Sequence, residues 1–168
     1  PTDALSPGDL SSGVGGWSFS CWFKVELWYP YQVLFWKQTD ATNFCFIRIQ
    51  SGGEVRFHYE INDIRYLTHY SLPAVVSGAW NHVVIAIDAS EPEASRVRMY
   101  VNGQDATDDS SLDISVPLSL PGSATELGHR PGSVELNNGI LEDTRIYNHA
   151  LSQSEVEDLY DDLCGHPK

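Results

Sequence analysis

The fold of this 168-residue chain is decided by residues 139–152, which read GILEDTRIYNHALS. Residues 139–147 have the pattern of a β-strand, the last clear one in the chain. Ser152 then opens a capping box with Glu155, ahead of apolar residues spaced for one helix face: Val156, Leu159 and Leu163. We therefore expect the chain to close with a strand and one short C-terminal helix, which ends by Cys164-Gly165.

Upstream of this stretch, apolar and polar residues alternate with the period of two that is typical of β-strands. In residues 43–50, for example, Phe44, Phe46 and the stem of Arg48 share one face, and the intervening residues share the other. The strands predicted in this way are residues 17–23, 31–37, 43–50, 55–60, 64–67, 80–88, 96–101, 115–120, 125–128 and 139–147. Many short strands with Gly and Asn turns predict an all-β antiparallel β-sandwich that forms a single domain over residues 1–168.

Residues 139–152 resemble the closing signature of laminin-G-like, concanavalin A-like jelly-roll domains, a superfamily that includes the pentraxins. Two further segments agree in the family's order. Trp17–Lys24 resembles its opening strand, and Trp80–Val83 with Met99–Gly103 resembles its Trp-x-His-Val and Tyr-Val-Asn-Gly pair. The resemblance implies a concanavalin A-like jelly roll with core tryptophans at positions 17, 22, 36 and 80. The family usually opens with a further strand before the position of Pro1. Either the sequence is trimmed there, or a neighbouring domain or subunit supplies that strand.

The composition excludes some classes of binding partner. Lys and Arg total 10 against 23 Asp and Glu, a net charge of −13. Because nucleic acids and anionic membranes select cationic surfaces, we expect no nucleic-acid partner and no membrane insertion, and a polyanionic glycan is expected to bind poorly unless calcium bridges it. The family's members imply a secreted or cell-surface location. Of the three cysteines, Cys21 and Cys45 are expected as buried free thiols, and Cys164 stays open between a free thiol and an external link.

Catalytic patterns are missing from the sequence. Glycoside hydrolysis needs two carboxyl groups about 5–9 Å apart. Glu54 and Glu60 flank one expected strand but are six residues apart, which corresponds to about 20 Å along a strand. No nucleophile-elbow motif is present either. We therefore expect a protein that is not an enzyme.

A calcium site is implied by the resemblance, through Glu142 with its neighbour Asp143. Adjacent residues on a strand point to opposite faces, so only one of the two is expected to face a given ion. The alternative is that one acid is solvated and the other pairs with Arg145 or caps a turn. The acidic run between Asp105 and Asp113 is expected to be a solvated loop.

Sugars stack on aromatic rings, and polar side chains fix their hydroxyl groups. Two aromatic groups are candidates for this role, and some of their rings are instead expected to cover the sandwich edge. The candidate carbohydrate-binding residues are Trp28, Tyr29, Tyr31, His58, Tyr59, Tyr66 and Tyr70. The leading hypothesis is a non-catalytic extracellular carbohydrate-binding module, assisted by calcium. The alternative is a structural or adhesion subunit of a filament, stalk or particle that uses the sandwich for assembly.

Overall fold

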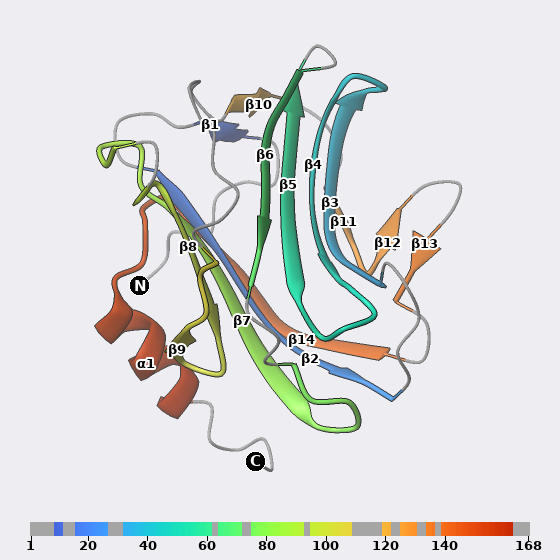
Figure 1. Ribbon diagram of the computed structural model, residues 1–168, viewed down its shortest axis with the longest axis vertical. Helices are drawn as coiled ribbons and strands as arrows, with labels where there is room; N and C mark the ends of the chain where they lie inside the picture. The colour runs from blue at the N-terminus through green and yellow to red at the C-terminus, as the bar shows by residue number, and fades with distance from the viewer. Residues whose placement is uncertain are drawn as a thin grey trace.

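Two five-stranded antiparallel sheets form the body of the protein (Figure 1). The computed structural model describes residues 9–11, 16–26, 32–61, 64–71, 75–92, 95–108, 119–121, 125–130, 134–136 and 139–162. The first sheet, called the β2 sheet, has the order β14 (Gly139–Tyr147), β2 (Trp17–Val25), β7 (Trp80–Ile87), β8 (Val97–Val101), β9 (Gln104–Asp105). The second, called the β4 sheet, has the order β11 (Thr125–Leu127), β3 (Gln32–Asp40), β4 (Asn43–Ile49), β5 (Val55–Ile61), β6 (Ile64–Tyr70).

Two short ribbons and one helix complete the described structure. One ribbon pairs β1 (Asp9–Ser11) with β10 (Ser119–Pro121), and the other pairs β12 (His129–Arg130) with β13 (Val134–Glu135). The helix α1 (Gln153–Asp162) follows β14. No helix among the described residues is long and apolar enough to span a membrane. The expected antiparallel sandwich with one C-terminal helix is thus confirmed.

The core lies between the two sheets and follows from strand alternation. On β2, Phe19, Cys21 and Phe23 point inward as the sequence pattern predicts, and all three are fully buried. They pack against the inner face of the β4 sheet, which includes Ile47 and Phe57. Removing this apolar surface from water is the main stabilising contribution to the fold, at roughly 25 cal/mol per Å².

Both described cysteines lie in this core. Cys21 and Cys45 are free thiols with no exposed surface, as the sequence predicts. Burial raises the pKa of each thiol far above its usual range, because the thiolate would lose its hydration. Both groups are therefore inert at neutral pH. Cys164 lies outside the described residues.

Only one of the four predicted core tryptophans occupies the space between the sheets. Trp17 packs there. Trp22 lies on the outer face of the β2 sheet and Trp36 on the outer face of the β4 sheet, while Trp80 is half-buried at a strand end. Trp22 and Trp36 are buried, as the resemblance implies, but they lie in apolar layers outside the two sheets.

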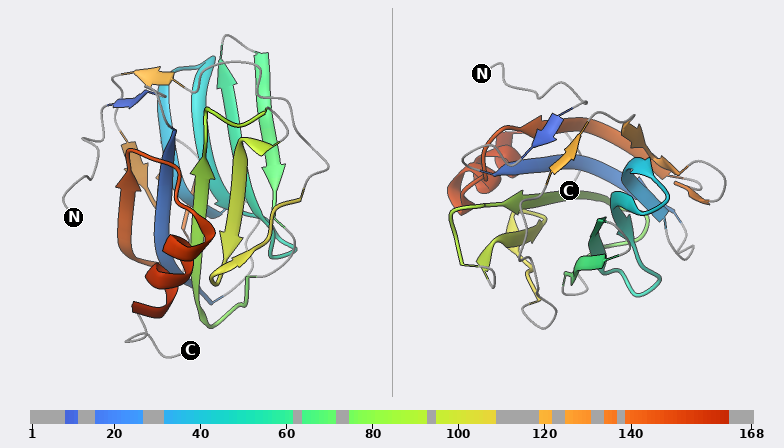
Figure 2. Two further views of the ribbon diagram at one scale, coloured as in Figure 1. Left: turned by 90° about the vertical axis from the view of Figure 1, so that its left-hand side faces the viewer. Right: turned by 90° about the horizontal axis from the view of Figure 1, so that it is seen from above.

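The helix α1 packs against part of the outer face of the β2 sheet (Figures 1 and 2). Tyr160 of the helix stacks on Trp22, with ring centroids 5.5 Å apart. Val156, which is fully buried, joins Val84 and Tyr100 in a second apolar cluster. The helix therefore occupies that part of the outer face, and its position is set by the residues that join it to β14.

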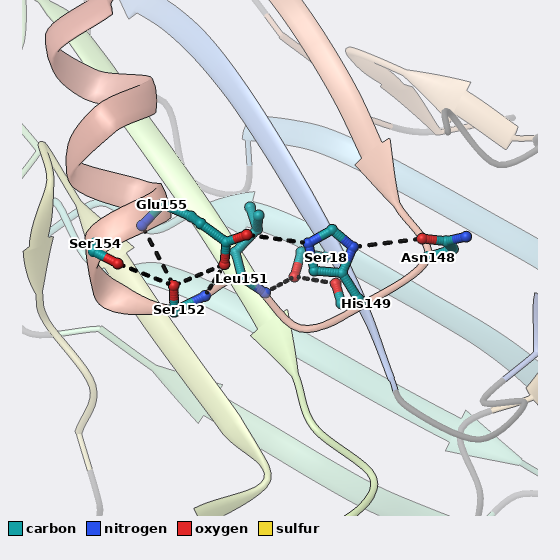
Figure 3. A network of polar contacts seen from close by, with 7 residues as sticks. All are labelled: Ser18, Asn148, His149, Leu151, Ser152, Ser154 and Glu155. Atoms are coloured by element: carbon teal, nitrogen blue, oxygen red, sulfur yellow. Dashed lines mark hydrogen bonds and ion pairs between the residues drawn. The ribbon is translucent and has the colours of Figure 1, made fainter. Parts of the chain in front are cut away.

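Those joining residues form a polar clasp (Figure 3). Ser18 of β2 donates its hydroxyl to the His149 carbonyl at 2.9 Å and accepts the Leu151 N–H at 2.8 Å. Ser152 donates both its N–H and its hydroxyl to Glu155, at 2.8 and 2.7 Å. The predicted capping box is confirmed, and it fixes where the helix begins.

Candidate functional site

The outer face of the β4 sheet carries a layer of aromatic and basic side chains. In the strand register Trp36, Phe46 and His58 lie opposite one another across β3, β4 and β5. Arg48 and Arg56 form a directly opposed pair one row further along. We call this surface the arginine–aromatic face, and its members are Trp36, Phe44, Phe46, Arg48, Arg56, His58 and Arg130.

The rings of this face stack nearly parallel. Trp36 and Phe46 have centroids 5.5 Å apart and planes within 6° of each other. Phe46 and His58 are 4.8 Å apart. Trp36, Phe46 and His58 are each 5% exposed or less, whereas Phe44 is half-buried. The three buried rings therefore have almost no surface for a sugar to stack on, and they serve as a packed base for the polar groups around them.

Three guanidinium groups lie on that base. Arg48 is 4.6 Å and Arg56 5.3 Å from the centroid of Phe46. Arg130, from β12, lies 4.4 Å from the centroid of Trp36. All three side chains are half-buried. Cation–π contacts of this kind hold a guanidinium group in place while its N–H groups stay able to donate.

Hydrogen bonds order the face further. Arg56 Nη2 lies 3.4 Å from His58 Nδ1, and His58 Nε2 lies 3.2 Å from Glu60 Oε2. This arrangement matches the imidazole tautomer with its proton on Nε2, which accepts from Arg56 and donates to Glu60. Trp36 donates its indole N–H to Gln38 at 3.3 Å. The face therefore combines fixed donors with a carboxylate and an amide, the groups that bind hydroxyl and anionic ligands.

The predicted sugar-binding residues fall in three places. His58 belongs to the arginine–aromatic face. Tyr59 points the other way: it is 1% exposed within the main core, so its ring is not available to a ligand, and its prediction as a binding residue is wrong. For Tyr66 and Tyr70 the structure describes the backbone only, which places Tyr70 opposite Arg56 in the register. The predictions at Trp28, Tyr29 and Tyr31 lie outside the described residues.

The acids of the predicted calcium site lie at a β-bulge in β14. The register with β2 shifts between Glu142 and Arg145, and Asp143 has a positive φ of 46°. Strict alternation is lost at the bulge, so the expected opposite orientation of the two acids does not follow. Glu142 is exposed, and Asp143 accepts a 2.8 Å hydrogen bond from Arg145. The pairing of Asp143 with Arg145 is part of the alternative that the sequence offered.

A calcium ion would find few ligands among these groups. Asp143 Oδ1 is held by Arg145, and Oδ2 is buried without a hydrogen-bond partner among the described residues. Within that part of the chain, no three His, Cys, Asp or Glu side chains are placed to share a metal ion. Because calcium takes six to eight oxygens, the described residues do not fit a calcium site by themselves.

A buried polar pair lies under α1. Ser20 Oγ and His82 Nε2 are 2.8 Å apart, and both side chains are almost fully buried. Asp143 and Arg145 act on His82 electrostatically. Trp22 stacks on the imidazole, and the tilted ring of Tyr160 lies 6.1 Å from it, so the two rings help to shield the pair from solvent. No sequence pattern indicated this Ser–His pair, because its members are 62 residues apart.

A shallow pocket lies on the same side of the molecule. It has a volume of about 330 Å³ and is lined by Ala86, Asp88, Glu91, Ser95, Arg96, Arg98, Ala150, Leu151 and Ser152. The carboxylates of Asp88 and Glu91 lie beside the two arginines, so the pocket has no excess of one charge. The arginine–aromatic face differs in having three half-buried arginines over stacked rings.

Sequence reasoning missed most of this face, although a signal was present. The strand β4 is apolar on both sides, with Phe44 and Phe46 on one and Cys45 and Ile47 on the other. A strand of a two-layer sandwich buries only one face in the core. The second apolar face therefore has to lie outside, and in this strand it ends at Arg48.

The two packed antiparallel sheets define the chain as a jelly-roll β-sandwich. The model of the concanavalin A-like lectin/glucanase superfamily matches residues 2–157. The chain belongs to this superfamily. No curated protein matches its sequence significantly.

Solved structures with the same fold include several sugar-binding proteins. Domain 4 of an extracellular arabinanase from Geobacillus stearothermophilus, solved with arabinotriose, has a TM-score of 0.66 at 20% identity, over 89% of this chain and 69% of that one. A sialidase carbohydrate-binding module from Ruminococcus gnavus, bound to sialyllactose, has a TM-score of 0.66 at 17% identity, over 94% and 95%. A pentraxin from Limulus polyphemus has a TM-score of 0.62 at 16% identity, over 95% and 73%. These structural similarities show that the chain shares the fold of these proteins.

Proposed function

We propose that this protein is a non-catalytic, extracellular carbohydrate-binding module and that the arginine–aromatic face is its binding surface. One observation carries the proposal. Part of the outer face of the β2 sheet is buried under α1, whereas the outer face of the β4 sheet presents half-buried donors and acceptors on a base of stacked rings. Rigidly held polar groups recognise hydroxyl patterns with little loss of side-chain entropy.

The structural neighbours support the general class of ligand. The arabinanase domain was solved with arabinotriose and the sialidase module with sialyllactose. The arabinanase is an extracellular enzyme, which agrees with the location proposed here. The manner of binding differs from the stacking that the sequence suggests, because most ring faces of the site are covered. Hydrogen bonds from Arg48, Arg56 and Gln38 take the leading role, with Phe44 as the available ring edge.

Calcium assistance remains a prediction of the family resemblance. Of the two predicted ligand residues, Asp143 contributes one unengaged oxygen, and that oxygen lies on the β2 sheet. Any calcium there would stabilise the strand β14 and would not contact a sugar on the β4 sheet. Glycan binding is therefore expected to be the same in calcium and in EDTA.

The proposal is tested with a panel of neutral and acidic oligosaccharides, presented in calcium and in EDTA. Phe44→Ala removes the half-buried ring of the face, and we expect it to weaken binding about tenfold, the loss typical of a buried apolar contact of this size. Ile140→Ala is the matched control, because Ile140 is 53% exposed on β14 of the other sheet. It should leave the affinity unchanged.

Two results would contradict this assignment. An equal loss of affinity in both variants would show that the binding site is not on the β4 sheet. Absence of binding to every glycan would favour the alternative, a structural or adhesion subunit. In that case the solution mass should show oligomers, and Phe44→Ala should impair their assembly.

A further inference from the structure

The arrangement of Arg48 and Arg56 is unusual for two like charges. They are directly opposed on β4 and β5, on the same face of the sheet. Both guanidinium groups approach the same ring, that of Phe46. Like charges placed directly opposite on neighbouring strands destabilise the pair. An anion that contacts both guanidinium groups would lower that repulsion, so the geometry of the pair fits a carboxylate.

The pair is also held ready for such a ligand. Phe46 beneath the two groups is 5% exposed and fixed between the rings of Trp36 and His58. His58 accepts from Arg56, and Glu60 in turn accepts from His58. Arg130 adds a third guanidinium group over Trp36. Guanidinium forks fixed in this way match the two oxygens of a carboxylate, and little entropy is lost when it binds.

The net charge of the chain sets a limit on the ligand. With a charge of −13, the molecule as a whole repels polyanions, and this repulsion acts over roughly a Debye length of about 8 Å at physiological salt. A single carboxylate on an otherwise neutral oligosaccharide experiences mainly the local arginines. Glu60 and Gln38 lie on the same face two rows from the arginine pair, where Glu60 accepts from His58 and Gln38 accepts from Trp36.

We propose that the arginine–aromatic face selects acidic sugars, with the carboxylate of a uronic or sialic acid residue bound between Arg48 and Arg56. The inference rests on the proposed carbohydrate-binding function and specifies its ligand. Both arginines also interact elsewhere within the chain, so the carboxylate competes for them with internal partners. Uronic acids and sialic acids share this chemistry, because each carries one carboxylate on a pyranose ring.

Isothermal titration with two matched ligand pairs tests this assignment. The first pair is sialyllactose and lactose, and the second is trigalacturonic acid and its methyl ester. We expect the acidic member of one pair to bind about tenfold to a hundredfold more tightly than its neutral partner, as for charge-assisted hydrogen bonds. That preference should shrink when NaCl rises from about 50 to about 500 mM, because salt screens the attraction. The pair that shows it identifies the source of the carboxylate.

The variants locate the carboxylate. Arg48→Gln should reduce the affinity for the acidic sugar to that for its neutral partner, and Arg48→Lys should give an intermediate value because it keeps the charge without the fork. Arg98→Gln makes the same charge change on the outer face of the β2 sheet and should have no effect. Arg56→Gln provides a second test if the thermal unfolding of Arg48→Gln shows a loss of fold.

The outcomes separate this inference from the proposed function. Equal binding of acidic and neutral partners would overturn the selection of acidic sugars while leaving carbohydrate binding in place. The selection is also overturned if Arg98→Gln weakens binding as much as Arg48→Gln, because the effect would then come from net charge. No binding in any of the four titrations would overturn the selection of acidic sugars, and the proposed function would then depend on the wider oligosaccharide panel.

Discussion

His82 is the residue whose surroundings alter its chemistry most clearly. Its side chain is 1% exposed on β7, beneath Trp22 and Tyr160. Burial lowers the pKa of its imidazole from 6.5 to about 4, because the charged ring would lose its hydration. Asp143 partly opposes this shift and Arg145 adds to it. At neutral pH the ring is therefore uncharged, and it shares a hydrogen bond with Ser20.

This depressed pKa predicts a loss of stability in mild acid. Since the pKa is lower in the folded state, the unfolded chain takes up a proton first as the pH falls below 6.5. The free energy of unfolding should therefore fall between pH 7 and pH 5, by about 2 kcal/mol from this residue. In denaturant unfolding, the His82→Gln variant should lose about 2 kcal/mol less free energy of unfolding between pH 7 and pH 5 than the parent protein loses.

His149→Gln is the comparison for this experiment. Its imidazole is 48% exposed, in contrast to that of His82. Replacing it should leave the acid-induced loss of stability nearly unchanged. If His82→Gln and the parent protein lose equal stability between pH 7 and pH 5, the burial argument for His82 is wrong.

At this scale the sequence predicts the core better than the site. Alternation on β2 predicts the inward positions of Phe19, Cys21 and Phe23, because one face of a sandwich strand is always buried. Alternation does not separate the inner from the outer apolar face of β4. For this reason it fails to distinguish Tyr59, which is a core residue, from Trp36, which lies on the outer face.

Among the elements, α1 is the one whose position depends most on a few polar groups. Ser152 caps its first turn through Glu155, whose pKa is lowered by the Ser152 N–H and then by the Ser152 hydroxyl. Gln153 donates its amide to the Gly103 carbonyl at 2.9 Å and so ties the helix to the β8–β9 turn. The cap therefore positions the helix that covers His82.

Ser152→Ala should cost about 1 kcal/mol of unfolding free energy, the usual cost of removing an N-cap side chain. Chemical denaturation monitored by tryptophan fluorescence measures it, because Tyr160 of the helix stacks on Trp22. Ser154→Ala is the matched control: Ser154 is exposed within the first turn of the helix and should change stability little. An equal cost in both variants would show that the cap is not what holds the helix.

Elements are the level at which sequence reasoning works best. The expected span of the last strand, residues 139–147, and the helix after Ser152 both agree with β14 and α1. Their signals are local: alternation, a turn and a capping box. The bulge at Asp143 has no such signal, since it depends on the pairing of β14 with β2, which is a contact between distant parts of the chain.

At the scale of the whole molecule, the two outer faces differ in what they present. One is partly covered by α1 and buries His82, and the other carries three arginines on stacked aromatic rings. Composition predicts an acidic molecule with little affinity for polyanionic glycans. That expectation averages over the surface, whereas strand register gathers Arg48 and Arg56 at one place. Global charge and local charge thus lead to different predictions for a sparsely charged sugar.

The most direct test of the proposed binding surface is to map backbone amide chemical shifts while the tightest-binding glycan is titrated into the protein. If the arginine–aromatic face is the binding surface, the largest changes will lie on β3, β4 and β5, around Phe46 and His58. Changes confined to residues 28–31 would instead favour the loop aromatics of the sequence hypothesis. Changes around Arg98 and Leu151, with none on β4, would contradict the central claim.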